Sequence, residues 1–103
     1  MGSRLVLLAL PIALARPALA GETIRVAINQ LKFEPLEISA HVGDTIEWAS
    51  SDFVVHTATA RNNDWDVTVP AKGVGRVTLQ HAGDVEYFCR FHPNMTGRIL
   101  VAP

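Results

Sequence analysis

The sequence predicts an all-β protein, built as a β-sandwich or a barrel. Apolar and polar residues alternate over several short stretches, which is the pattern of half-buried strands. Turn-forming runs such as Gly43-Asp44 and Ala82-Gly83-Asp84 recur between these stretches. Seven or so short strands separated by regular turn signals are typical of a sandwich or a barrel.

The strands can be assigned in chain order from this alternation. Residues 36–42 and 45–48 flank Gly43-Asp44, so we predict that they form a hairpin, with Ile46 and Trp48 facing the core and His41 facing outward. Residues 54–59 are rich in β-branched side chains. The expected strands are residues 24–28, 36–42, 45–48, 54–59, 65–69, 77–79, 85–88 and 99–101.

Residues 1–20 have the features of a signal peptide. Arg4 precedes an apolar run over residues 5–15, and an Ala-x-Ala motif ends at Ala20. The run is shorter than the roughly 20 apolar residues that span a membrane. We therefore expect cleavage after Ala20, one domain over residues 21–103, and a periplasmic or secreted protein. The alternative is an uncleaved N-terminal anchor.

The net charge of the expected mature domain is small. Without Arg4 and Arg16 it contains seven basic and ten acidic residues, a charge of −3 with histidines neutral. These charges are dispersed, so they do not favour nucleic acid or an anionic membrane as a partner.

The segment with the clearest chemistry contains Cys89, His92 and Met95, spaced at i, i+3 and i+6. This spacing suits a tight loop or a single helical-type turn, and Pro93 and Gly97 argue against a long helix. A thiolate, an imidazole and a thioether form a soft donor set that favours copper. Cys89 is the only cysteine and cannot form an internal disulfide, so in an oxidising compartment a bound metal is the safer state for its thiol.

A blue-copper site requires a second imidazole, and three other histidines are available. His41 is expected to face solvent, and His81 lies next to a turn. His56 follows two valines on an expected strand, and a sandwich can bring distant strands together at one end. His56 is therefore the preferred fourth ligand.

Taken together, these motifs resemble the cupredoxins. The Cys-x-x-His-x-x-Met spacing is similar to that of the amicyanins, the short-loop members that serve amine-oxidising dehydrogenases. The resemblance implies a Greek-key β-sandwich with one Cu(I)/Cu(II) ion, held by His56, Cys89 and His92 in the equatorial positions and by Met95 in the axial position. The motifs are Phe33 and Pro35 before Leu36-Glu37-Ile38, residues 43–48, Val55-His56-Thr57, and Tyr87-Phe88-Cys89 with His92 and Met95.

Two residues depart from the family pattern. Thr57 stands where many cupredoxins have an asparagine that ties the two ligand loops together, and a hydroxyl would make a similar bond with a shorter reach. Arg90 stands where a small residue is frequent. Its guanidinium would either stabilise the reduced site or lie in solvent.

Other functions compete with electron transfer. A Cys-His hydrolase would leave Met95 unexplained, and methionine is not a usual zinc ligand. A purely structural reading makes Cys89 and Met95 core residues. A periplasmic copper carrier or storage module using the same four ligands is the main alternative. We expect a type 1 copper electron-transfer protein that is not itself an enzyme.

The expected partners are redox donor and acceptor proteins, with a dehydrogenase and a cytochrome as candidates, that dock near His92. Phe91, Pro93 and Phe53 are predicted to form an apolar patch around its ring edge, remote from Lys72. Small and transient contacts are typical of electron-transfer complexes. We expect the protein to be a monomer.

Overall fold

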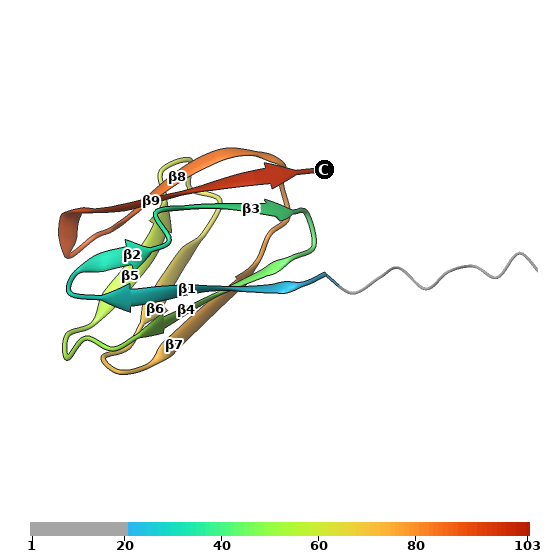
Figure 1. Ribbon diagram of the computed structural model, residues 1–103. Helices are drawn as coiled ribbons and strands as arrows, with labels where there is room; N and C mark the ends of the chain where they lie inside the picture. The colour runs from blue at the N-terminus through green and yellow to red at the C-terminus, as the bar shows by residue number, and fades with distance from the viewer. Residues whose placement is uncertain (1–20) are drawn as a thin grey trace, which may run out of the picture.

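The computed structural model describes residues 21–103, whose apolar side chains pack between two β-sheets (Figure 1). One sheet has the strand order β2-β1-β4-β7 and the other the order β3-β9-β8-β5-β6. This arrangement confirms the predicted all-β sandwich. The strands in this part of the chain are β1 (Thr23–Asn29), β2 (Lys32–Glu34), β3 (Glu37–His41), β4 (Thr45–Ser50), β5 (His56–Ala60), β6 (Asp66–Val69), β7 (Val74–Thr78), β8 (Gly83–Cys89) and β9 (His92–Ala102).

The predicted signal peptide lies outside the described residues and stays a prediction. Within residues 21–103 we find no helix with the length and apolar character needed to cross a membrane.

Aromatic side chains fill the centre of the sandwich. Trp48 on β4 and Tyr87 on β8 are almost completely buried, and the Trp48 Nε1–H donates to the Tyr87 hydroxyl over 3.3 Å. Both rings also pack against Trp65. Burial raises the pKa of Tyr87 to about 12, so the phenol stays protonated at neutral pH. The hydrogen bond therefore links the two sheets through neutral groups.

The predicted hairpin over residues 36–48 is wrong. Strand β3 pairs in parallel with β9, whereas β4 pairs in parallel with β1 and antiparallel with β7. Gly43 does form a turn, with a φ of 95° that favours glycine, but this turn carries the chain from one sheet to the other. Both strands face the same core from opposite sides. Ile46 and Trp48 are buried as predicted, but the alternation over residues 36–42 holds only in part, because Ala40 is buried whereas Leu36 and Val42 are exposed.

The last strand begins earlier than predicted. Strand β9 starts at His92 rather than near residue 99, and its core-facing positions are Met95, Gly97, Ile99 and Val101. Pro93 and Gly97 hid this alternation in the sequence. The short strand β2 was also missed, because three residues are too few to show a period.

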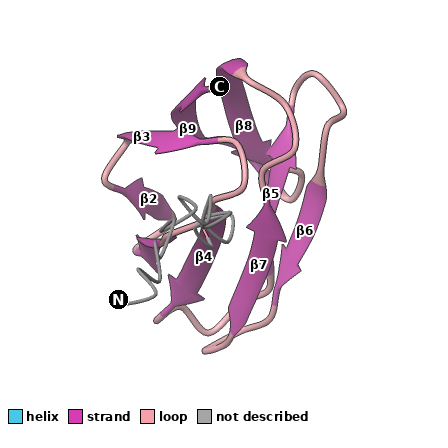
Figure 2. Ribbon diagram, turned by 90° about the vertical axis from the view of Figure 1, so that its right-hand side faces the viewer, coloured by secondary structure: helices cyan, strands magenta, loops and turns pink. Residues whose placement is uncertain are grey.

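Four turns lie at one end of the sandwich. Figure 1 shows the turns that follow β1, β4, β6 and β8 at the left-hand end, opposite the C-terminus. Along one side of the molecule the two sheets meet where β6 runs beside β7 (Figure 2). The left-hand end therefore gathers loops from both sheets.

Replacing Gly97 by alanine should destabilise the fold. A Cβ atom there would overlap the Tyr87 ring, so β9 would have to move away from β8. Overpacking of this kind costs about 1–3 kcal/mol. Urea unfolding of the metal-free protein measures this loss, and Thr96→Ala at the exposed neighbouring position is the control, expected within about 0.5 kcal/mol of the parent. Equal stability of Gly97→Ala and the parent would contradict the close packing.

Candidate metal centre

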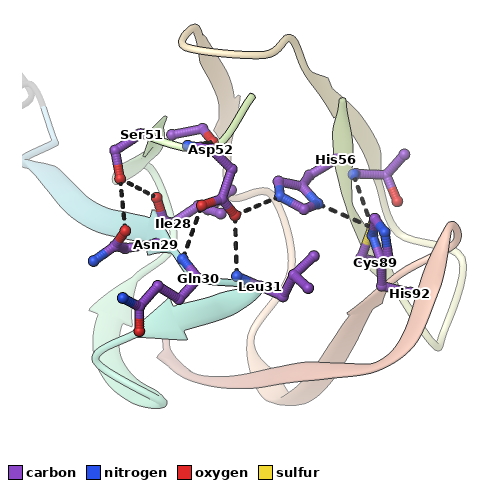
Figure 3. Close-up of polar contacts among 11 residues, drawn as sticks. Ile28, Asn29, Gln30, Leu31, Ser51, Asp52, His56, Cys89 and His92 are labelled. Atoms are coloured by element: carbon purple, nitrogen blue, oxygen red, sulfur yellow. Dashed lines mark hydrogen bonds and ion pairs between the residues drawn. The ribbon is translucent and has the colours of Figure 1, made fainter. Parts of the chain in front are cut away.

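Three donor groups converge at the end of the sandwich that holds the four turns. His56 begins β5, Cys89 ends β8 and His92 begins β9. The Cys89 Sγ atom lies 3.7 Å from His56 Nδ1 and 3.6 Å from His92 Nδ1, and all three donor atoms lie within 4.8 Å of one another. Figure 3 shows both imidazole rings directed at the sulfur.

The spacing of these donors fits a single transition-metal ion. An ion bonded to sulfur at about 2.3 Å and to imidazole nitrogen at about 2.0–2.1 Å, with angles of about 110–120°, separates the sulfur from each nitrogen by about 3.5–3.8 Å. Both observed sulfur–nitrogen distances lie in this range. One thiolate and two imidazoles form the trigonal donor set of blue-copper sites.

Strand pairing brings these residues together from distant parts of the chain. Strand β5 pairs with β8 at Thr59–Phe88 and Ala60–Tyr87, which places the start of β5 beside the end of β8. Strands β8 and β9 form a hairpin in which Cys89 pairs with His92 across a two-residue tip, and the register shifts between Phe88 and Cys89. The donors at i and i+3 therefore flank a β-turn rather than lie on a helical turn.

Asp52 holds the ring of His56. Its Oδ2 atom lies 2.8 Å from His56 Nε2, and its two carboxylate oxygens accept the backbone N–H groups of Gln30 and Leu31 over 2.8 and 3.0 Å (Figure 3). Gln30 and Leu31 form the turn after β1, with φ angles of 52° and 61°. Asp52 thus joins the loop before β5 to the other sheet.

This contact also selects the tautomer of His56. Burial raises the pKa of Asp52, but the hydrogen bonds from Leu31, His56 and Gln30 together outweigh burial and hold that pKa below its usual value. An ionised carboxylate only accepts, so Nε2 carries the proton and Nδ1 is left with its lone pair towards Cys89. Sequence reasoning missed Asp52, although its place four residues before a candidate ligand was a usable signal.

The sulfur of Cys89 is enclosed by backbone from β5. Cys89 is completely buried, and the backbone N–H of Thr57 donates to its Sγ over 3.4 Å. The Thr57 hydroxyl accepts the backbone N–H of Arg90 over 2.8 Å. The threonine therefore does tie the two ligand loops together, and the Arg90 guanidinium is paired with Asp66 over 3.2 Å.

The remaining candidate ligands are a buried methionine and two exposed histidines. Met95 is buried on β9, three residues after His92, with 3% of its surface exposed. His41 and His81 have exposed side chains and lie near carboxylates, at 3.9 Å from Asp44 and 3.7 Å from Asp64. Neither joins the group formed by His56, Cys89 and His92 among the described residues.

Comparisons with known proteins establish the family. A model of the cupredoxin-like domain matches residues 3–101, so the chain belongs to the cupredoxin-like family. Amicyanin from Paracoccus versutus is 24% identical over 86 residues, covering 78% of this chain and 65% of that protein, so the chain spans about two thirds of the relative's length.

Solved amicyanin structures share the fold. The crystal structure of amicyanin from Paracoccus versutus is 26% identical, with a TM-score of 0.67 over 82% of this chain and 83% of that chain. A reduced Cu(I) form of an amicyanin variant at pH 4 is 27% identical, with a TM-score of 0.67 over 82% and 86%. The chain is thus a cupredoxin whose His-Cys-His group, with Met95 next along β9, is consistent with a type 1 copper site.

Removing the Asp52 carboxylate should weaken metal binding. Asp52→Ala leaves His56 without its tautomer-fixing partner, and changes of this kind cost about 10–100-fold in metal affinity. Competition with a copper chelator measures the change. Asp52→Asn should fall between Asp52→Ala and the parent, because its amide oxygen still accepts a hydrogen bond but carries no charge. Asp64→Ala, on a carboxylate outside this group of residues, is the control, and an Asp52→Ala affinity equal to that of Asp64→Ala would contradict the role of Asp52.

Proposed function

We propose that this cupredoxin is a type 1 copper electron-transfer protein. In this proposal His56, Cys89 and His92 are the equatorial ligands and Met95 is the axial one, as in the amicyanin-like motif. Copper bound there would supply a one-electron Cu(I)/Cu(II) couple. The protein itself would transform no substrate and would not be an enzyme.

The observation that supports this function most strongly is the unequal exposure of the donors. Cys89 and His56 are completely buried, whereas His92 is only partly buried and lies next to the exposed tip of the β8–β9 hairpin. An electron can pass through the edge of a partly exposed imidazole without any ligand leaving its place. A route of this kind suits single-electron exchange with a docked protein.

A copper carrier or storage module using the same ligands is the alternative. A carrier passes its ion on by ligand exchange, so an incoming donor must reach the ion beside the thiolate. The Cys89 sulfur is enclosed by the Thr57 backbone and by the two imidazoles. This enclosure favours electron transfer over copper transfer.

The residues around the site also favour a geometry that stays constant. Asp52 fixes His56, Thr57 N–H contacts Cys89, and backbone pairing holds Cys89 opposite His92. Each of these contacts is made by the protein itself. A donor set held in place in this way lowers the rearrangement that accompanies a change of oxidation state.

Exposed apolar side chains lie in the turns at the end of the sandwich that holds the site. Phe53 is 84% exposed in the loop after β4, and Phe91 is 53% exposed at the hairpin tip, so Phe91 does not turn into the core. Leu31, Val54 and Val55 are also exposed in the turns at this end. Lys72 is not remote as expected, because its Nζ atom lies 4.0 Å from the centre of the Phe53 ring. Arg90 is a second nearby cation, with its Cζ atom 5.5 Å from the centre of the Phe91 ring. An apolar surface with two cations beside it suits a small, transient redox complex.

The partners in this proposal are a redox donor and a redox acceptor that dock at this surface. A dehydrogenase as donor and a cytochrome as acceptor are the candidates that the amicyanin-like motif suggests. The proposal further places the protein in the periplasm, or outside the cell, as a monomer.

A copper titration tests the function. The Cu(II)-loaded protein should be blue, with an intense thiolate-to-copper absorption band, and should cycle between oxidation states without losing copper. Cys89→Ser should remove the band and leave the fold intact, because the core is formed by aliphatic and aromatic residues. A colourless parent, or copper lost to a chelator at each reduction, would favour the carrier. An unchanged band in Cys89→Ser would contradict thiolate ligation.

Electron self-exchange between two copies tests the docking surface without a partner protein. Phe91→Ala should slow self-exchange about tenfold, because truncating a central aromatic contact weakens an encounter complex. NMR line broadening of mixed oxidised and reduced protein measures this rate. Val42→Ala is the control, since Val42 is exposed in the turn between β3 and β4, at the other end of the sandwich. An equal effect of the two substitutions would place the contact elsewhere.

A further inference from the structure

Thr57 and Arg90, the two departures from the family pattern, are linked in this structure. The Arg90 backbone N–H donates to Thr57 Oγ1 over 2.8 Å. Because Cys89 and Arg90 share a peptide bond, this hydrogen bond fixes the orientation of the peptide group that follows the thiolate. Thr57 also contacts the sulfur directly through its own backbone N–H, at 3.4 Å.

The Thr57 hydroxyl is one member of a longer chain of hydrogen bonds. Its Oγ1 atom lies 3.0 Å from Thr59 Oγ1, and Thr59 Oγ1 lies 2.7 Å from Asp66 Oδ1. The Thr59 hydroxyl has one hydrogen, and an ionised carboxylate only accepts, so Thr59 donates to Asp66. The hydrogen between the two threonines must then come from Thr57.

The Arg90 side chain closes this chain into a ring. Its Nε–H donates to the same Asp66 Oδ1 atom over 3.2 Å. The Thr59 hydroxyl and Arg90 together hold the pKa of Asp66 below its usual value, so the carboxylate is ionised at neutral pH. The strand register supports the same geometry, since Thr59 on β5 pairs with Asp66 on β6.

Three of the donors in the ring point the same way around it, and the Arg90 side chain meets them at Asp66 from the other side. They run from the Arg90 N–H to Thr57, from Thr57 to Thr59 and from Thr59 to Asp66, where the Arg90 guanidinium also donates. Hydrogen bonds in such a chain polarise and strengthen one another. The charges of Arg90 and Asp66 offset each other, and the ion pair holds the guanidinium beside the first residue of β6.

We propose that the closed ring of Thr57, Thr59, Asp66 and Arg90 is a positioning device for the Cys89 sulfur. It replaces a single family asparagine with hydrogen bonds that span β5, β6 and the ligand hairpin. Within residues 21–103, Thr59 and Asp66 form no hydrogen bond or ion pair with the sulfur or the imidazoles, so both act through Thr57 and Arg90. The spectroscopic test of this proposal rests on the proposed copper site, whereas the amide-exchange test on the metal-free protein does not.

Three substitutions separate the ring from general strand stability. Thr59→Val removes the hydroxyl and keeps the shape, Thr59→Ser keeps the hydroxyl, and Thr68→Val changes an exposed position on β6. In the metal-free protein, the Arg90 amide should exchange with solvent about tenfold faster in Thr59→Val only, because Thr57 no longer has an acceptor for its hydrogen. Asp66→Ala, at a side chain about half exposed, should have the same effect if Thr59→Val does not fold.

The copper-loaded protein provides an independent readout. A weaker Thr57 N–H contact leaves the thiolate more electron-rich, so in Thr59→Val the thiolate absorption band should move to lower energy and the reduction potential should fall. Thr59→Ser should restore both values, and Thr68→Val should leave them unchanged. Unchanged amide exchange and an unchanged band in Thr59→Val would overturn the proposal. Faster Arg90 exchange in a protein that binds no copper would support the ring and reject only the copper function.

Discussion

The pairing of β5 with β8 is the contact on which the rest of the site depends. It joins residues about thirty positions apart in the sequence and places the first residue of β5 beside the last residue of β8. His56 and Cys89 meet only because of this pairing, and the β8–β9 hairpin then adds His92. Main-chain hydrogen bonds, which are independent of any metal, therefore set the spacing of the donors. A site prepared in this way requires little ordering when an ion binds.

Two buried polar contacts around the candidate ligand atoms have different effects. Asp52 presents Nδ1 of His56 by holding the proton on the opposite nitrogen. The Thr57 backbone N–H donates to the sulfur of Cys89, which is completely buried. A hydrogen-bond donor of this kind lowers the cost of a negative charge on a buried sulfur. The first contact sets which nitrogen of His56 faces Cys89, and the second would stabilise a thiolate ligand of the proposed metal ion.

Much of the fold followed from local patterns in the sequence. The period of two identified core-facing residues such as Ile46 and Trp48, because alternation depends only on which side of a strand faces the core, but it failed at the ends of the segment 36–42, where Leu36 and Val42 are exposed. The pairing partner of each strand could not be inferred from local sequence patterns. Residues 36–42 and 45–48 were joined into a hairpin on a turn signal, but parallel pairing with β9 and β1 places them in different sheets. Strand β9 was underestimated because Pro93 and Gly97 were treated as breakers, although glycine is the residue that fits beside Tyr87.

The candidate metal ligands could be predicted because cysteine, histidine and methionine are rare residue types with distinctive chemistry. Cys89, His92 and Met95 form a distinctive spacing, and His56 could be chosen over His41 and His81 by the environment expected for each strand. Asp52 was missed, although it lies four residues before His56 in the sequence. Thr59 and Asp66 could not be assigned, since acidic and hydroxyl residues are common and their roles depend on contacts across strands. The effects of Thr57 and Arg90 were left open for the same reason. Such roles are assigned from distances between atoms, which a single sequence does not provide.

The position of Asp52 has a thermodynamic consequence. All of the proposed ligands belong to the sheet that contains β5, β8 and β9, yet Asp52 bonds to the turn between β1 and β2 in the other sheet. A ligand that binds only the folded state raises the free energy of unfolding of every segment that must be folded for binding. Through Asp52, that requirement extends to the turn between β1 and β2. Metal binding by the sheet that contains β5, β8 and β9 would therefore be linked to the folding of the β1–β2 turn in the other sheet. At this end of the sandwich, the two sheets would unfold together.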